Sequence, residues 1–307
     1  MSRCSSAIWG CEVTDYIINP ALEAQYNVRT AIPEHPGIFE AWAAQSRACR
    51  DRGNTVLDLA YGRTAAETLD LFPAAVPHAP LQAFIHGGYW QSRDKAEFSF
   101  LAEGLAAAGV SVAILNYGLC PAVSLGTIVD QMRRAMLWLW RNAGAYGVDP
   151  ARLHVAGHSA GGHLAAVLLA TDWQSLDADA PADLVRSGLS ISGIFDLDPL
   201  RATSLNRALG LDAESARRLS PIFMSPNGHR PFVLAVGEAE SAAFHDQSAR
   251  MEVAWGQFGV PMERFSLAGC NHLTAVSELA RPGSQLLAAA LRLIHLDQAA
   301  PGSMAPR

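Results

Sequence analysis

A five-residue motif, Gly157-His-Ser-Ala-Gly161, is the part of the chain best suited to chemistry. It comes after an apolar run at residues 153–156 that is typical of a buried strand, and before an Ala/Leu-rich helical segment at residues 164–170. A G-x-S-x-G motif in this setting forms a tight strand-to-helix turn that exposes the serine Oγ. The first N–H groups of the helix point to where negative charge develops during acyl transfer. We therefore expect Ser159 to be a nucleophile.

A second glycine-containing stretch can supply donors for that negative charge. His86-Gly87-Gly88 follows an uncharged run at residues 81–85 that predicts a buried strand. Adjacent glycines let backbone N–H groups approach a substrate oxygen without interference from side chains. We expect Gly87, Gly88 and Ala160 to form the oxyanion hole. His86 opens the turn and is expected to hydrogen-bond within the loop rather than to act as the base.

A serine nucleophile also needs a base and an acid that orients the base. His272 lies in the loop after the last predicted strand. It is the best placed of the ten histidines, since the others flank the serine too closely, open the glycine turn, or lie outside the loops that follow strands. Glu238 and Glu240 both follow the preceding strand, and their spacing does not decide between them. Asp246 is expected on a helix, facing solvent.

Several motifs, spread over about residues 20–295, carry the signature of one superfamily. They are Leu22-Glu-Ala-Gln-Tyr26-Asn-Val-Arg29, His86-Gly-Gly-Tyr-Trp90, Gly157-His-Ser-Ala-Gly161 with Gly162-His163, Ile191-Ser-Gly-Ile-Phe-Asp-Leu197, Glu240-Ser-Ala-Ala-Phe244 and Asn271-His272. The chain resembles the α/β-hydrolase superfamily, in which serine, acid and histidine occur in this order. Within it, the chain is similar to the kynurenine formamidase (arylformamidase) group and its bacterial carboxylesterase relatives. Related esterases of the hormone-sensitive-lipase type have glycine at Tyr89 and aspartate at His158, and these two departures favour the formamidase side.

The resemblance implies a function and an acid. The family's acidic residue stands directly before a Ser-x-x-Phe run, which places it at Glu240, although Glu238 remains a rival because glutamate here replaces the aspartate of the animal enzymes. The implied enzyme is a serine hydrolase that cleaves a small acyl group from an aryl amide such as N-formylkynurenine. A carboxylesterase acting on short-chain or aryl esters is the alternative. Neither reaction requires a metal or another cofactor.

The substrate pocket is harder to predict. Tyr89, Trp90, His158 and Phe195 lie near the predicted catalytic loops and could line it, but core packing explains each aromatic ring equally well. A non-catalytic hydrolase fold that serves as a binding module is a remote alternative. Such a module would lack the serine, the base or the acid, and the sequence contains all three.

Alternating strands and helices must position these residues. The predicted strands are residues 55–60, 68–72, 81–85, 110–115, 153–156, 187–192, 232–236 and 262–267, and the main helices are 37–52, 95–108, 123–146, 241–258 and 284–296. This order implies βαβ units and a mostly parallel sheet. We expect one α/β-hydrolase domain over residues 1–307, an eight-stranded, mostly parallel sheet flanked by helices. An N-terminal extension would cover about residues 1–54 and a lid-like insertion about residues 193–230.

Composition limits the remaining possibilities. Half of the 307 residues are hydrophobic and 17% are charged, which suits a globular core. The net charge of −6 argues against a nucleic-acid partner, and no apolar run is long enough for a membrane span. Five widely spaced cysteines and an N-terminus without an apolar core predict free thiols in a cytoplasmic protein. The expected partner is a small amide or ester, and a homodimer is compatible with the sequence.

Overall fold

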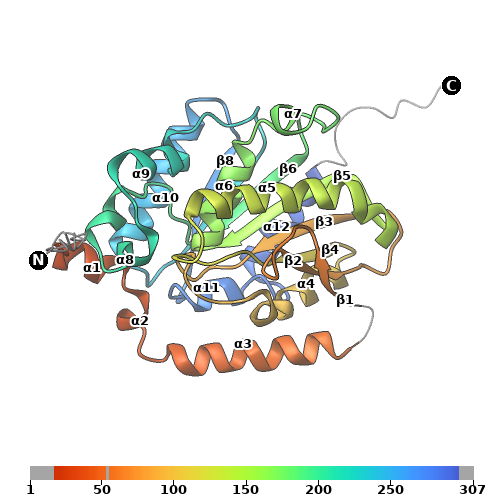
Figure 1. Ribbon diagram of the computed structural model, residues 1–307. Helices are drawn as coiled ribbons and strands as arrows, with labels where there is room; N and C mark the ends of the chain where they lie inside the picture. The colour runs from red at the N-terminus through yellow and green to blue at the C-terminus, as the bar shows by residue number, and fades with distance from the viewer. Residues whose placement is uncertain (1–16, 53–54, 297–307) are drawn as a thin grey trace, which may run out of the picture.

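An eight-stranded sheet runs through the centre of the protein (Figure 1). The computed structural model describes residues 17–52 and 55–296. The sheet order is β1-β2-β4-β3-β5-β6-β7-β8. Its strands are β1 (Val56–Ala60), β2 (Thr68–Phe72), β3 (Ala79–Ile85), β4 (Ser111–Leu115), β5 (Val148–His158), β6 (Val185–Ile191), β7 (Phe232–Gly237) and β8 (Met262–Leu267). Strand β2 is antiparallel to both neighbours and the other adjacent pairs are parallel, so the predicted mostly parallel sheet is confirmed.

Helices cover both faces of the sheet (Figure 1). The α-helices are α1 (Pro20–Tyr26), α2 (Val28–Ala31), α3 (His35–Arg50), α4 (Ala102–Ala107), α5 (Leu125–Asn142), α6 (Ala160–Leu169), α7 (Trp173–Leu176), α8 (Asn206–Leu209), α9 (Ala213–Leu219), α10 (Ala242–Gly256), α11 (Thr274–Ser277) and α12 (Gln285–Leu296). Short 3₁₀ turns are η1 (Lys95–Glu97), η2 (Ser99–Leu101), η3 (Ala143–Tyr146), η4 (Asp198–Ala202) and η5 (Pro221–Phe223).

The alternation of side chains along each strand divides the core into two layers. In β3, Leu81, Ala83 and Ile85 pack into the layer that contains α5, α6 and α10. Phe84 points to the opposite layer, which contains α3, α4 and α12. Because successive side chains of a strand face opposite sides of the sheet, a fully buried central strand must be apolar on both faces. All seven residues of β3 are buried, as this requires.

The elements predicted from the sequence were wrong in three places. The helix expected over residues 95–108 is regular only in α4 and begins as two 3₁₀ turns. There the buried Lys95 ammonium pairs with Asp58 and Asp70 at 2.6 and 2.5 Å, so the chain follows this ionic contact instead of a regular helix. Strand β5 is longer than expected and begins at Val148 instead of residue 153, because Val148 pairs with Ala79 of β3. The short helix α7 does not appear among the elements predicted from the sequence.

The strand order places one crevice at the carboxyl edge of the sheet. The chain passes from β3 to β4 on one side and then through α5 to β5 on the other side of β3. Ligands of doubly wound sheets bind at this kind of switch point. Ile85 and Gly157 are aligned partners at the ends of β3 and β5, so the two glycine-containing motifs of the sequence emerge side by side.

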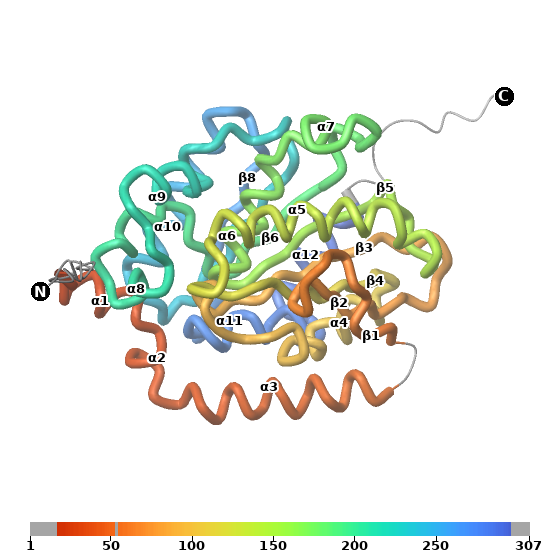
Figure 2. The backbone as a smooth tube through the Cα atoms, in the orientation of Figure 1, coloured from red at the N-terminus to blue at the C-terminus, as the bar shows by residue number. Residues whose placement is uncertain are grey.

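The N-terminal helices lie outside the sheet and approach the same edge. Figure 2 shows the chain running from α1, near α8, through α2 to the long helix α3. Helix α1 contacts η4 and α10, whereas α3 packs on η1 and η2. The segment between β6 and β7, which the sequence predicts as a lid-like insertion, contains η4, α8, α9 and η5.

Three of the five cysteines, Cys49, Cys120 and Cys270, are buried free thiols. Burial raises the pKa of the Cys49 and Cys120 thiols to about 11. Such thiols stay protonated at neutral pH and are poor nucleophiles. Cys4 and Cys11 lie outside the described residues.

Candidate active site

Ser159 occupies a strained turn between β5 and α6. Its backbone has φ 57° and ψ −117°, a conformation that costs a non-glycine residue of order 1–3 kcal/mol. The Ser159 N–H donates to the carbonyl of Ile191 at 2.8 Å, which holds the turn against the neighbouring strand. A Cβ at Gly157 would collide with the backbone of Gly161, and a Cβ at Gly161 would collide with the carbonyl of Ile85. The motif needs its glycines because strand, turn and helix are in direct contact.

Glycines from the loop after β3 lie beside this serine. A Cβ at Gly87 would be 3.1 Å from the Ser159 Cβ, so the two backbones approach closely. Gly88 has φ +110°, and a Cβ there would collide with the carbonyl of Ser92. Ala160 is the first residue of α6, and its N–H therefore lacks a partner within the helix. The three predicted oxyanion donors belong to two segments that converge at Ser159.

The buried side chain of His86 holds the loop that contains Gly87 and Gly88. This buried imidazole lies 2.8 Å from the carbonyl of Gly87 and 3.1 Å from the side-chain oxygen of Asn116. It also stacks on Tyr117, with ring centroids 4.2 Å apart. Burial lowers the pKa of His86. The residue is therefore placed within the loop, as the sequence predicts, and is engaged there rather than exposed to a substrate.

Glu240, at the end of the β7 loop, binds the imidazole of His272. Its Oε2 lies 2.6 Å from His272 Nδ1, and the carboxylate is fully buried. Its Oε1 accepts from the Ser192 hydroxyl at 2.5 Å and from the Gly237 N–H at 2.6 Å. Burial by itself would raise the pKa of Glu240, but the charge of His272 and these hydrogen bonds hold it below its usual range. Glu240 is thus ionised at neutral pH.

The other two acidic candidates point elsewhere. The exposed Glu238 accepts from the backbone N–H of Gly269 at 2.9 Å. Asp246 lies on α10, as expected, where its carboxylate is mostly exposed and 3.6 Å from Arg250. Neither carboxylate contacts the imidazole of His272.

His158 ties the serine turn to the loop that carries His272. Its Nε2 lies 2.8 Å from the carbonyl of His272, and the two rings are 4.9 Å apart. Because a carbonyl can only accept, Nε2 carries the proton of the neutral ring. Burial, reinforced by the charge of His272, lowers the pKa of His158 to about 3. His158 is therefore a neutral ring that adds no charge beside the serine.

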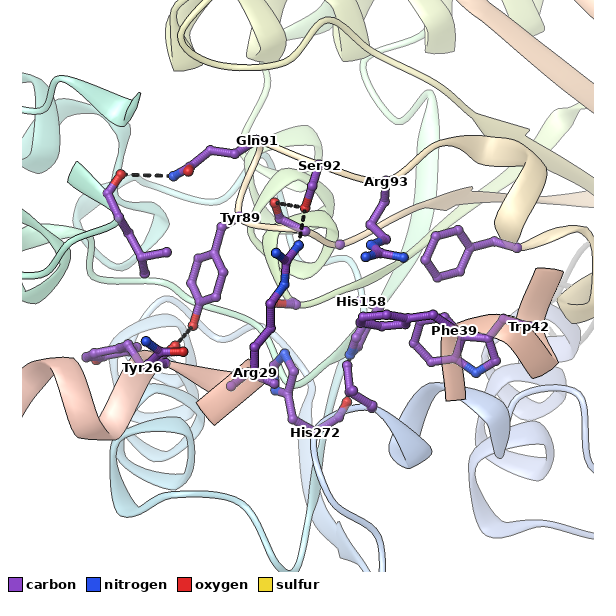
Figure 3. Close-up of a pocket in the computed structure, with 18 residues that line it drawn as sticks. Tyr26, Arg29, Phe39, Trp42, Tyr89, Gln91, Ser92, Arg93, His158 and His272 are labelled. Atoms are coloured by element: carbon purple, nitrogen blue, oxygen red, sulfur yellow. Dashed lines mark hydrogen bonds between the residues drawn. The ribbon is translucent and has the colours of Figure 1, made fainter. Parts of the chain in front are cut away.

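Ser159 and His272 face one pocket of about 350 Å³ (Figure 3). Of the four predicted pocket residues, Tyr89 and His158 line it. Trp90 and Phe195 do not, because both are completely buried in the core, where Trp90 packs on His163 and Phe195 on Phe232. For these two rings core packing is the observed role.

Much of the pocket wall comes from residues that were not among the predicted pocket residues. The N-terminal helices contribute Tyr26, Asn27, Val28, Arg29, Phe39 and Trp42, and the loop after β3 adds Gln91, Ser92 and Arg93. Phe39 and Trp42 are neighbours on α3, with ring centroids 5.4 Å apart. An aromatic stripe on one helix face was visible in the sequence, but nothing local indicated which surface it would cover.

Comparison with known proteins places this geometry in a family. The BD-FAE family model matches residues 69–254, more than half of the chain. The kynurenine formamidase of Danio rerio is 30% identical over 247 residues, 78% of this chain and 82% of that protein. The kynurenine formamidase of Salmo salar is 32% identical over 206 residues, 65% of this chain and 68% of that protein.

Among solved structures, a protein of Silicibacter sp. TM1040 with the provisional name thioesterase is 32% identical. It superposes with a TM-score of 0.78 and covers 87% of this chain and 97% of its own. Within residues 17–52 and 55–296, no helix combines the length and apolar character needed to cross a membrane. The matched sequence and fold together show that the chain belongs to the BD-FAE family of α/β hydrolases and is a hydrolase of the formamidase and esterase type.

Proposed function

We propose that Ser159, His272 and Glu240 form a nucleophile–base–acid triad. The observation that carries this proposal is the 2.6 Å contact between buried Glu240 and His272 Nδ1, beneath a pocket that Ser159 and His272 share. In this arrangement the carboxylate accepts a hydrogen bond from His272 Nδ1–H, which leaves the Nε2 lone pair free to take the serine proton. The exposed Glu238 has no such contact, which supports Glu240 as the acid.

The proposed reaction proceeds through an acyl-enzyme. Ser159 Oγ bonds to the acyl carbon while its proton passes to His272, and the negative charge moves to the carbonyl oxygen. The N–H groups of Gly87, Gly88 and Ala160 donate hydrogen bonds to that oxygen. Each such donor stabilises the transition state by about 3 kcal/mol. The imidazolium then protonates the leaving amine or alcohol as its bond to the acyl carbon breaks. His272 then takes a proton from water as the water oxygen bonds to the acyl carbon. It returns this proton to Ser159 Oγ as the ester bond breaks and the carboxylic acid leaves.

The proposed substrate is an aryl formamide of the N-formylkynurenine type. Support comes from the match to the kynurenine formamidase of Danio rerio over 82% of that protein. The pocket is compatible with an aromatic substrate, since Tyr26, Phe39, Trp42, Tyr89 and Phe98 contribute to its lining. Offset or edge-on contacts with such rings add to the burial of a flat substrate.

The test is a rate comparison on the purified protein. We expect kcat/KM for N-formylkynurenine to exceed that for 4-nitrophenyl acetate, and both activities to disappear in Ser159→Ala. A fluorophosphonate probe should label the wild type and not the variant, which also excludes a non-catalytic binding module. Full turnover by Ser159→Ala would overturn the triad.

A second candidate function is hydrolysis of short-chain or aryl esters. It is favoured by the 32% identical structural relative, whose provisional name is thioesterase. The two functions share the triad and differ in the leaving group, an amine or an alcohol, and in the size of the acyl group that the pocket must hold. Rapid turnover of the acetate with negligible deformylation of N-formylkynurenine would leave the triad in place and favour the esterase.

A further inference from the structure

The charges that line the pocket have one sign. Eighteen residues line it, and they include two arginines, Arg29 and Arg93, but no aspartate or glutamate. The chain as a whole has a net charge of −6, so a cationic pocket is not a general property of its composition. The sign of the lining therefore bears on the charge of the ligand.

The two arginines differ in how their charges are compensated. The Arg93 guanidinium bonds to Glu97 at 2.6 Å and lies over the Phe39 ring at 3.7 Å. Arg29 donates to the Ser92 hydroxyl at 3.3 Å. Among residues 17–52 and 55–296, no carboxylate lies within ion-pair distance of Arg29. Within the part of the chain that the structure describes, Arg29 thus brings a positive charge without an ion-pair partner to the pocket.

Arg29 is placed to meet a substrate bound at Ser159. It extends from α2 towards Ser92, between Tyr89 and Arg93 in the view of Figure 3, with His272 below it. Its side chain is exposed, as befits the mouth of the pocket. A substrate whose acyl group lies at Ser159 would cover part of the guanidinium and remove water from it. That desolvation is costly unless the substrate supplies an anion, and a planar carboxylate suits a guanidinium best.

We propose that Arg29 selects aryl amides or esters that carry a carboxylate away from the reacting acyl group. The inference rests on the proposed function only in that Ser159 cleaves an aryl acyl compound. It identifies a specificity-determining residue and a substrate class, an aryl acyl anion. The N-terminal extension, remote in sequence from the catalytic loops, supplies this residue.

A purely positioning role for Arg29 makes a different prediction. The Ser92 hydroxyl also donates to the carbonyl of Gly88 at 3.1 Å, so Arg29 is linked through Ser92 to the proposed oxyanion loop. If Arg29 acted only by holding this loop, its loss would slow anionic and neutral substrates equally. Charge recognition would slow only the anionic ones.

The experiment uses two matched pairs of substrates. One pair is 4-acetoxybenzoate and its neutral analogue 4-acetoxybenzamide, and the other is 4-formamidobenzoate and 4-formamidobenzamide. The enzymes are the wild type, Arg29→Gln, Arg29→Lys and the control Arg207→Gln, which removes an exposed charge on α8 outside the pocket. Comparing variant with wild type on each substrate cancels differences in intrinsic reactivity.

We expect Arg29→Gln to lower kcat/KM for the carboxylates about tenfold, mainly through KM, and to change the carboxamides less than about twofold. Arg29→Lys should retain part of the preference, Arg207→Gln should retain all of it, and added salt should weaken it. Equal losses on both members of a pair, or no carboxylate preference in the wild type, would overturn the proposal. If neither formamide is cleaved, the formamidase function fails, while the acetate pair still tests Arg29.

Discussion

The floor and the side wall of the pocket are built differently. The floor consists of loops at the carboxyl edge of the sheet, where the side chains of Ser159, Glu240 and His272 are buried or nearly so. Much of the wall comes from the N-terminal segment, which is attached by polar contacts to backbone groups and by the packing of Tyr26 and Trp42 in the core. Ser241 donates to the carbonyl of Gln25 at 2.7 Å, and Tyr89 donates to that of Tyr26 at 2.5 Å.

This difference separates two tasks. A group that must be held in catalytic geometry needs a rigid, fully hydrogen-bonded surrounding. Contacts of a surface that recognises a substrate exist in both the ground state and the transition state. Their loss therefore weakens substrate binding without slowing the chemical step. Changes to the floor should therefore lower kcat, and changes to the wall should act mainly on KM and substrate preference.

The largest expected effect is at Ser159. Ser159→Ala removes the proposed nucleophile and should lower kcat by about 10⁴- to 10⁶-fold, with little change in substrate binding. Single-turnover assays and equilibrium binding of N-formylkynurenine would measure the two quantities. A variant that retained acyl-enzyme formation would show that the floor is not the reacting surface.

The next effect compares two glutamates of one loop. Glu240→Gln keeps the shape but removes the carboxylate that orients His272, and should lower kcat about 10²- to 10⁴-fold. The matched Glu238→Gln changes an exposed carboxylate that accepts from the Gly269 N–H, and should alter kcat less than about twofold. Equal losses would mean that the acid has been assigned to the wrong residue.

Two buried histidines next to Ser159 in the chain or on α6, His158 and His163, should make stability depend on pH. Burial lowers the pKa of His158 to about 3 and that of His163 to about 4, below the usual value near 6.5. Below about pH 6.5 the unfolded chain binds protons that the folded protein does not, so the free energy of unfolding falls as the pH decreases towards about 4. Each such histidine contributes up to about 1.4 kcal/mol per pH unit.

Denaturant unfolding between pH 7 and pH 4.5 would measure this dependence. His163→Gln keeps a donor for the carbonyl of Leu219 but cannot titrate. The slope of its free energy of unfolding against pH should therefore be smaller than that of the wild type, by up to the equivalent of one bound proton. An unchanged slope in this variant would show that His163 is protonated in the folded protein.

The smallest expected effect is in the wall. Phe39→Leu removes the ring beneath Arg93 while retaining an apolar side chain, and should raise KM for aryl substrates about two- to fivefold with kcat nearly unchanged. Steady-state kinetics on an aryl and an alkyl ester would test it, since only the aryl ester should be affected. A loss confined to kcat would contradict the separation of floor and wall.

The sequence by itself determined the sheet and, apart from the choice between Glu238 and Glu240, the residues of the candidate floor. Strand and helix patterns, the G-x-S-x-G turn and the glycine pair after β3 depend on neighbours in the chain, and seven of the eight strands begin within two residues of their predicted positions. The adjacency of Gly87 and Ser159 then follows from the pairing of β3 with β5.

Only the tertiary structure revealed that Glu240 and not Glu238 contacts His272. It also buried Trp90 and Phe195 and brought Arg29 to the pocket. The two glutamates differ in the partners they meet, Gly269 and His272, which are about 30 residues further along the chain. The wall depends on α1–α3 docking against segments distant in sequence, and amphipathic helices do not encode which surface they cover. Contacts of this kind are set by the folded shape of the whole chain, so local patterns could not reveal them.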